Sequence, residues 1–310
     1  MPGIGIISNP HSKLNKRSPA EASRLKALIG QKGVFTSTQD LEHLDATISA
    51  YRDTAISILA IVGGDGTISQ TIGRIIRIYG SRPLPHIAVL RGGTMNVIAS
   101  HLGVKGQPAE ILLRLIQTVE QGYPLSLTTV TTMKIGEVYG FLYADQSSTS
   151  ILKEFYRKKN GRIGASLLTM RLIHSFLSGS PLIKKIIQSQ KLKAHFRPEG
   201  HFESSVLGCF AGTISKMPLG LPMLAQANSK PGHFQATMIT CKAEKLLWYL
   251  PLIMLQQKEG PSIGKHSVYC QSAFLQYEGS VDYTVDGEIY HSPQGLIEIE
   301  AGPKISFVRL

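Results

Sequence analysis

Short apolar runs alternate with segments of helical periodicity over roughly the first 120 residues of the chain. Residues 56–62 form a run of branched apolar side chains, which is typical of a strand buried on both faces. The sequence Gly-Gly-Asp-Gly at 63–66 interrupts this run, and isoleucines then recur at helical spacing from Ile68. Thr67 is expected to cap that helix. The pattern predicts a strand, a glycine loop and a helix.

A second unit of the same kind follows. Residues 87–90 predict a strand, 91–96 a loop with paired glycines, and 97–102 the beginning of a helix. Similar patterns predict strands at 3–7 and 33–35 and helices at 19–29, 41–51 and 111–120. In an open parallel sheet, loops at the carboxyl ends of neighbouring strands face one crevice. The two glycine loops are therefore expected to meet there, with Asn9 after the first strand.

The pattern changes after residue 125, where short β-type runs replace the strand–helix alternation. Predicted strands lie at 127–133, 138–144, 206–211, 234–241, 268–275, 281–285, 296–300 and 305–308. Helices are expected at 151–188 and 244–257. The sequence therefore predicts an α/β domain over residues 1–125 and a mostly β domain with helical insertions over 126–302.

The glycine loop at 63–66 has the composition of a phosphate site. Glycines let a bulky anion approach bare N–H groups, and a helix that begins there adds its positive dipole end. Asp65 would repel a phosphate unless a metal ion or a proton transfer is involved, so it is a candidate for organising Mg²⁺ or for accepting a hydroxyl proton. An ordinary tight turn with a surface Asp is the plainer alternative.

The net charge of +12 has an uneven distribution. Residues 151–197 combine many Lys and Arg side chains with interleaved apolar residues, a pattern that favours binding to an anionic membrane surface. A packed helical pair with a solvated basic face is the alternative, and nucleic-acid binding is disfavoured because no stacking platform is evident. No signal peptide or membrane-spanning run is evident, and the three separated cysteines fit reduced thiols. A cytoplasmic, peripherally membrane-associated protein is expected.

Taken together, the motifs resemble the diacylglycerol kinase catalytic-domain family of lipid kinases, which includes sphingosine and ceramide kinases. The resemblance lies in Asn-Pro at 9–10, Gly-Gly-Asp-Gly-Thr at 63–67, Gly-Thr-Met-Asn at 93–96 and Asp-Gly-Glu at 286–288, in the family's order and spacing. It implies a nucleotide domain like that of NAD kinases, a β-sandwich lipid domain and ATP in the cleft between them. It also implies that the C-terminal strand, residues 303–310, can return to the first domain.

The resemblance further implies roles for individual residues. Asp65 and Glu288 would be catalytic, with Glu288 as base or metal organiser, and Asp65 and Asp286 would bind Mg²⁺. The residues implied to line the nucleotide are Asn9, Gly63, Gly64, Gly66, Thr67, Gly93, Thr94 and Asn96. Taken alone, Asp-Gly-Glu at 286–288 is an ordinary hairpin turn.

The expected function is an ATP-dependent lipid kinase of phospholipid biosynthesis that phosphorylates a hydroxyl of diacylglycerol or a related lipid. The expected partners are a lipid, an anionic membrane surface and a second copy in a homodimer. Two departures from the family pattern keep alternatives open: Val97 replaces an Asp of many bacterial members, and Ser147 replaces an acidic residue of sphingosine kinases. The alternatives are a nucleotide-binding regulatory protein with little kinase activity and a kinase of the NAD-kinase type with a soluble substrate.

Overall fold

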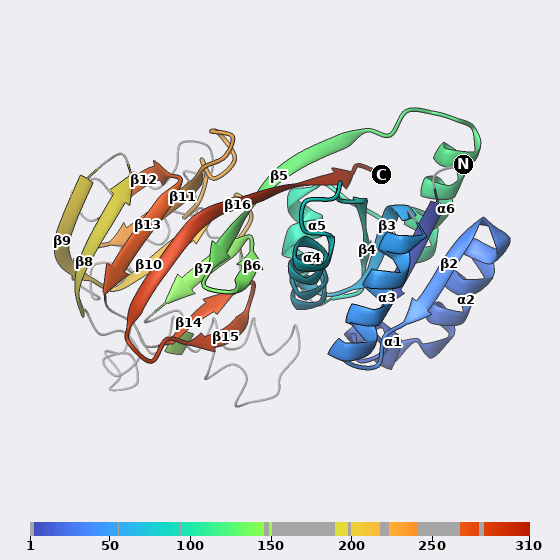
Figure 1. Cartoon of the computed structure of the whole chain (residues 1–310), viewed down its shortest axis with the longest axis horizontal. Coiled ribbons are helices and arrows are strands. Elements are labelled where there is room, and N and C mark those ends of the chain that lie inside the picture. The colour runs from blue at the N-terminus through green and yellow to red at the C-terminus, as the bar shows by residue number, and fades with distance from the viewer. Residues whose placement is uncertain are drawn as a thin grey trace, which may run out of the picture. The chain divides into compact units, whose positions relative to one another are not determined.

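The computed structural model describes residues 3–54, 56–93, 95–145, 149–150, 190–197, 200–217, 223–240, 267–278 and 282–310. The chain divides into two compact units (Figure 1). Unit 1 consists of Met1–Val130 with Pro303–Leu310, and unit 2 is Thr131–Gly302. The helices predicted at 151–188 and 244–257 lie outside the described residues.

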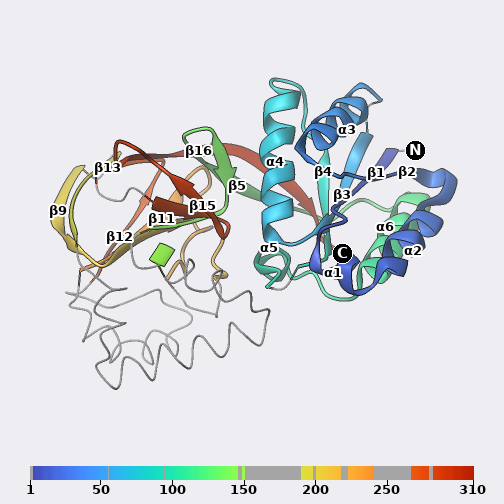
Figure 2. The ribbon, with the colours of Figure 1, turned by 90° about the horizontal axis from the view of Figure 1, so that it is seen from below.

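Unit 1 is built on a parallel sheet in the order β2-β1-β3-β4, which the end of β16 extends. Its strands are β1 (Gly3–Ser8), β2 (Gly33–Ser37), β3 (Ile56–Gly63) and β4 (His86–Arg91). From Ile58 to Gly63 every residue of β3 is buried, because β3 is covered on both faces. Figure 2 shows α3 and α4 on one face of the sheet and α2 and α6 on the other.

The helices of unit 1 follow the predicted periodicity, with two differences at the loops. They are α1 (Lys13–Arg17), α2 (Pro19–Ile29), η1 (Gly30–Lys32), α3 (Leu41–Asp53), α4 (Asp65–Tyr79), α5 (Val97–His101) and α6 (Pro108–Glu120). The prediction that Thr67 caps α4 is wrong, because the helix begins at Asp65 and its N-cap is Gly64. The segment after β1, where no helix was predicted, contains α1, which Ser12 caps by accepting from the Asn15 N–H.

Unit 2 is an antiparallel β structure with two sheets. In one, β13 lies between β16 and β8, and β9 pairs with β8; the other has the order β12-β11-β10-β7-β14-β15. The strands are β5 (Leu127–Ile135), β6 (Val138–Gly140), β7 (Leu142–Asp145), β8 (Gln190–Arg197), β9 (Gly200–Val206), β10 (Gly208–Gly212), β11 (Phe234–Ile239), β12 (Ser267–Ser272), β13 (Phe274–Glu278), β14 (Asp282–Val285), β15 (Glu288–His291) and β16 (Leu296–Val308). An α/β part followed by a mostly β part is the predicted fold class.

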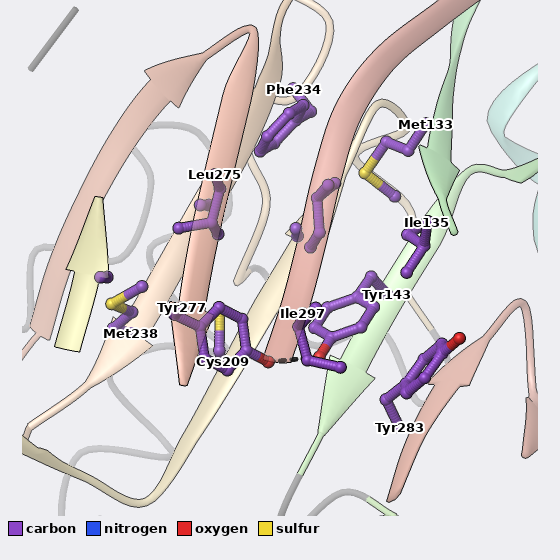
Figure 3. Close-up of a cluster of buried hydrophobic side chains, with 14 of the residues drawn as sticks. Met133, Ile135, Tyr143, Cys209, Phe234, Met238, Leu275, Tyr277, Tyr283 and Ile297 are labelled. Carbon is purple, nitrogen blue, oxygen red and sulfur yellow. Dashed lines mark hydrogen bonds between the residues drawn. The ribbon is translucent and has the colours of Figure 1, made fainter. Parts of the chain in front are cut away.

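Side chains from both sheets form one core in unit 2 (Figure 3). Leu275, Tyr277 and Ile297 come from the sheet of β13 and β16, whereas Tyr143 and Phe234 come from the six-stranded sheet. Along β16 the residues from 296 to 300 alternate between exposed and buried, as expected for a strand with one face on a core. The two sheets thus pack face to face as a sandwich.

Several strand boundaries in unit 2 differ from the prediction. The run at 268–275 is two strands in different sheets, which separate at Ser272–Phe274, and the runs at 296–300 and 305–308 are one strand, β16. Residues 190–197, included in the predicted basic insertion, form β8, where exposed Lys191 and Lys193 alternate with buried Leu192 and Ala194. These lysines therefore lie on the outer face of a sheet. Among the described helices, none is long and apolar enough to span a bilayer.

Candidate nucleotide site

Three loops of unit 1 begin at the same edge of its sheet. Ser8 at the end of β1 pairs with Val62 of β3, and Gly63 at the end of β3 pairs with Arg91 of β4. Because the three strands are parallel and in this register, the segments that follow them start side by side. The segments after β1, β3 and β4 are called the first, second and third loops. The edge is the carboxyl edge of an open α/β sheet, where ligands of such folds usually bind.

The two glycine loops approach each other too closely for side chains. A Cβ atom built on Gly93 would lie 2.5 Å from the Cα of Gly64, and one on Gly92 would lie 3.0 Å from the Gly63 nitrogen. The Gly92 N–H donates to the Gly63 carbonyl oxygen at 2.8 Å. Glycine is therefore required at these positions by the close backbone approach, which leaves main chain rather than side chain at the start of α4.

Helix α4 begins in this glycine-lined place without a side-chain cap. Its N-cap, Gly64, has no side chain to accept from the first N–H groups, and the first helical bond is the one from the Ile68 N–H to the Gly64 carbonyl. The N–H groups of residues 65–67 precede that bond, so they and the positive end of the helix dipole are available to an anion. Gly66 and Thr67 lie in this first turn.

Asp65 is the first residue of α4. It is half-buried, and helix α5, which follows the third loop, holds its side chain. One of its carboxylate oxygens, Oδ1, accepts from the Ile98 N–H of α5 at 3.0 Å. Asn96, just before α5, adopts a left-handed conformation with φ of 49°, and its side-chain amide forms hydrogen bonds with the N–H and C=O of Gly93. Asn96 thus closes its own loop, and α5 orients Asp65.

Asn9 connects the first loop to the second. Its Nδ2 donates to Thr67 Oγ1 at 3.0 Å, and its Oδ1 accepts from the His11 N–H at 2.8 Å. The structure therefore brings together the predicted residues of unit 1, from Asn9 and the 63–67 motif to Gly93 and Asn96. Thr94 lies outside the described residues.

Asn15 is a residue of this region that the sequence analysis missed. It is buried on α1, and its Nδ2 donates to Ser8 Oγ at 3.0 Å and to the Asn9 carbonyl at 2.6 Å. An asparagine inside a basic, polar segment gives no periodic signal, so the sequence pattern could not separate it from its neighbours. Lys16 and Arg17 are exposed in the last turn of the same helix.

Asp286 and Glu288 belong to unit 2, on the tight turn between β14 and β15. Asp286 and Gly287 both have positive φ angles, 48° and 90°, as a two-residue hairpin requires. The two carboxylate oxygens of Asp286 accept from the N–H groups of Phe141 and Leu142 at 3.0 and 2.9 Å. Glu288 is exposed at the first position of β15. In the part of the chain that the structure describes, no three His, Cys, Asp or Glu residues are grouped as metal ligands.

A buried carboxylate, Asp145, lies in the core of unit 2. It accepts from the Cys209 N–H at 2.7 Å and from the hydroxyl of Tyr277, and the hydroxyls of Tyr277 and Tyr143 share a further hydrogen bond, the dashed line in Figure 3. Burial raises the pKa of Asp145 from 3.8 to about 6, and the hydrogen bonds oppose that rise. Burial also raises the pKa of both tyrosines.

Comparisons with known proteins agree with this architecture. A crystal structure described as a diacylglycerol kinase from Bacillus anthracis str. Sterne is similar with a TM-score of 0.68 and 12% identity, covering 100% of this chain and 97% of that one. Two further structures from the same organism, named provisionally as diacylglycerol kinases, give TM-scores of 0.71 and 0.70 at 14% identity with the same coverage. At such low identity these likenesses show a shared fold, which confirms the predicted fold class. No curated protein matches the chain significantly in sequence.

The sequence also matches a known family over part of its length. Residues 4–126 match the family model of the diacylglycerol kinase catalytic domain. This range includes Asn9, Asp65 and both glycine loops, whereas the Asp-Gly-Glu motif at 286–288 lies outside the matched segment. Over residues 4–126 the chain is therefore similar in sequence to the diacylglycerol kinase catalytic domain family, which confirms the resemblance that the motifs predict.

Proposed function

We propose that the protein is an ATP-dependent lipid kinase that transfers the terminal phosphoryl group of ATP to a hydroxyl of diacylglycerol or a related lipid. The observation that carries this proposal is the meeting of two glycine loops at the uncapped start of α4, beside the half-buried carboxylate of Asp65. Phosphoryl transfer demands mainly positioning and compensation of negative charge. A backbone-lined anion site with one carboxylate supports both.

In this proposal the nucleotide phosphates lie against the glycine loops. The close approach of Gly64 and Gly93 keeps side chains out, so phosphate oxygens can accept from main-chain N–H groups at the start of α4. Asn9 and Thr67, which are hydrogen-bonded to each other, would border the same place. The nucleotide-lining set proposed is Asn9, Gly63, Gly64, Gly66, Thr67, Gly93, Thr94 and Asn96.

Asp65 is the residue proposed to meet the reacting groups. Its Oδ1 already accepts the Ile98 N–H, which fixes the carboxylate orientation and leaves its second oxygen for a metal ion or for the proton of the lipid hydroxyl. A lone carboxylate fits Mg²⁺, because this ion is commonly held by one or two carboxylates together with substrate phosphates and water. When bound, Mg²⁺ would supply charge compensation on the transferring phosphoryl group.

Glu288 is proposed as a second catalytic carboxylate, acting as base or metal organiser. Its exposure at the start of β15 leaves the carboxylate accessible. Asp286, the other proposed metal ligand, already uses both carboxylate oxygens to accept main-chain N–H groups. Binding a metal through Asp286 would thus have to share or break those bonds, so the geometry supports Glu288 better than Asp286.

We further propose that the protein works as a cytoplasmic, peripheral membrane protein. A lipid substrate requires access to a bilayer, and the net charge of +12 favours an anionic surface. The basic residues of 151–189 that suggested this surface lie outside the described part of the chain. A homodimer remains part of the proposal, and nucleic acid does not.

The test is transfer of labelled phosphate from ATP, with Mg²⁺, to a panel of lipids in mixed micelles. Wild type is compared with Asp65→Asn and with Asp53→Asn, a matched control because Asp53 is an exposed carboxylate at the end of α3 that pairs with Arg52. We expect Asp65→Asn to lower turnover by about 10²-fold or more, as for loss of a group that handles the reacting proton, and Asp53→Asn to retain it. Full activity of Asp65→Asn would refute its role.

The same assay separates the alternatives. A wild-type protein that binds ATP but labels no lipid would favour a nucleotide-binding regulatory protein, for which the apolar, buried Val97 at the start of α5 is the supporting observation. Labelling of soluble substrates alone, with no binding to anionic vesicles at low salt, would favour a kinase of the NAD-kinase type.

A further inference from the structure

We propose that Asn15 is a positioning residue for nucleotide binding: its buried amide holds the first loop so that Asn9 can meet the second. The inference rests on the proposed function in one respect, since it takes the ligand of the three loops to be a nucleotide. Asn15 would not touch the nucleotide itself. It would act through Asn9, whose carbonyl it binds and whose side chain it thereby orients.

The contacts of Asn15 are directed at the end of β1. Its side chain is 7% exposed, and Nδ2 donates to Ser8 Oγ at 3.0 Å and to the Asn9 carbonyl at 2.6 Å. Ser8 is fully buried. The carbonyl can only accept, which fixes the amide nitrogen rather than the oxygen at this contact. Both donated bonds fasten the point where the first loop leaves the sheet.

The hydrogen bonds around Asn15 join all three loops in one ring. Next to it, the Leu14 N–H donates to the Gly92 carbonyl at 3.2 Å, and the Gly92 N–H donates to the Gly63 carbonyl at 2.8 Å. From the second loop, Thr67 accepts from the Asn9 side chain. Helix α1 thus binds the third loop through its backbone and the first loop through Asn15.

The Oδ1 atom of Asn15 is buried without a hydrogen-bond partner among the described residues. The side chain is therefore anchored through its donors alone, and an unpartnered buried acceptor costs stability. Asn15→Asp tests the role of these donors directly, because the substitution keeps the shape of the side chain while removing both donated bonds. A carboxylate would face the Asn9 carbonyl with like partial charge and would displace the first loop.

A matched control lies in the same turn of chain. Ser12 Oγ accepts from the Asn15 N–H at 3.3 Å and caps α1, but it does not bind Ser8. Ser12→Ala therefore weakens α1 without removing the Asn15 amide. A general effect of unfolding α1 would appear in Ser12→Ala as well, whereas an effect of the amide would appear in Asn15→Asp alone.

The experiment titrates wild type, Asn15→Asp, Asn15→Ala, Ser8→Ala and Ser12→Ala with a fluorescent ATP analogue and Mg²⁺, and measures KM for ATP and for lipid separately. Circular dichroism establishes that each variant is folded. From the loss of two donated bonds we expect Asn15→Asp and Asn15→Ala to bind about tenfold more weakly. Ser8→Ala loses one of these bonds, so its affinity for the analogue should lie between that of the Asn15 variants and that of wild type. Ser12→Ala should stay within about threefold of wild type, and KM for lipid should not change in any variant.

Two results would overturn this inference alone: wild-type affinity in the folded Asn15 variants, or an equal loss in Ser12→Ala. If Asn15→Asp does not fold, Asn15→Ala and Ser8→Ala decide the question by the same comparison. A wild-type protein that binds no nucleotide would overturn the proposed function and this inference together. The two failures are therefore distinguishable in one titration series.

Discussion

The buried carboxylate of Asp145 should make the stability of unit 2 fall as pH rises. The carboxylate is fully buried in the core, and burial raises its pKa from 3.8 to about 6. Between these values the folded protein holds a proton that the unfolded chain has released. Unfolding therefore becomes easier with increasing pH across this window, which is the reverse of the usual behaviour of a salt-bridged Asp.

The magnitude follows from the size of the shift. A rise from 3.8 to about 6 corresponds to about 3 kcal/mol of unfolding free energy, at 1.36 kcal/mol per pKa unit. The loss begins near pH 4 and is complete above about pH 7, so about 2 kcal/mol of it falls between about pH 4.5 and pH 7. An Asn at this position does not titrate. It can accept from the Cys209 N–H through Oδ1 and donate to the Tyr277 hydroxyl through Nδ2.

The assay is urea unfolding followed by circular dichroism at a series of pH values from about 4.5 to 7.5, for wild type and Asp145→Asn. Other titrating groups cancel in the difference between the two proteins. We expect the unfolding free energy of Asp145→Asn, relative to that of wild type, to rise by about 2 kcal/mol between about pH 4.5 and pH 7. Glu203→Gln, which changes an exposed carboxylate on β9, should follow the wild-type curve. A constant difference between wild type and Asp145→Asn would refute the reasoning.

Two further predictions concern the loops and the turn. Gly93→Ala places a methyl 2.5 Å from a backbone Cα, so we expect about 1–3 kcal/mol of destabilisation and weaker ATP-analogue binding. Gly208→Ala is the control, because a Cβ atom there would lie 3.6 Å from its nearest neighbour. Its stability in denaturant and its affinity for the ATP analogue should both stay near wild type. Equal losses in the two variants would contradict the argument. Asp286→Ala leaves the N–H groups of Phe141 and Leu142 without their acceptor and should cost about 1–3 kcal/mol in urea unfolding even without Mg²⁺. A loss of stability confined to Mg²⁺-containing buffer would point instead to a metal-ligand role.

Much of unit 1 could be predicted because its signals are local. Continuous apolar runs and helical periodicity identified β1, β3, β4, α2 and α3 within a few residues. The start of α4 was placed wrongly because Thr67 is the better capping residue by composition, whereas the chain places backbone-only Gly64 there. The contact of Gly64 with Gly93 explains that choice, and it joins residues far apart in sequence.

Unit 2 was harder to predict because a strand with one buried face gives a weak pattern. In β8, basic residues alternate with Leu192 and Ala194. Because the charge of residues 151–197 favoured a membrane-binding segment, no strand was predicted at 190–197. The change of sheet at 272–274 was also missed, because the apolar character continues across it. Partner strands decide such boundaries, and a single sequence does not name the partners.

The acidic pair at 286 and 288 shows how backbone conformation can separate residues that a motif groups together. Two residues apart on a continuous strand, both side chains would lie on the same face. Here the positive φ angles of Asp286 and Gly287 reverse the chain between them. Asp286 turns back to bind the backbone at 141 and 142, and Glu288 begins the next strand with an exposed side chain. The motif therefore contains one carboxylate that stabilises the turn and one that is exposed beside it, so the catalytic role proposed for Glu288 would not require the hairpin to unfold.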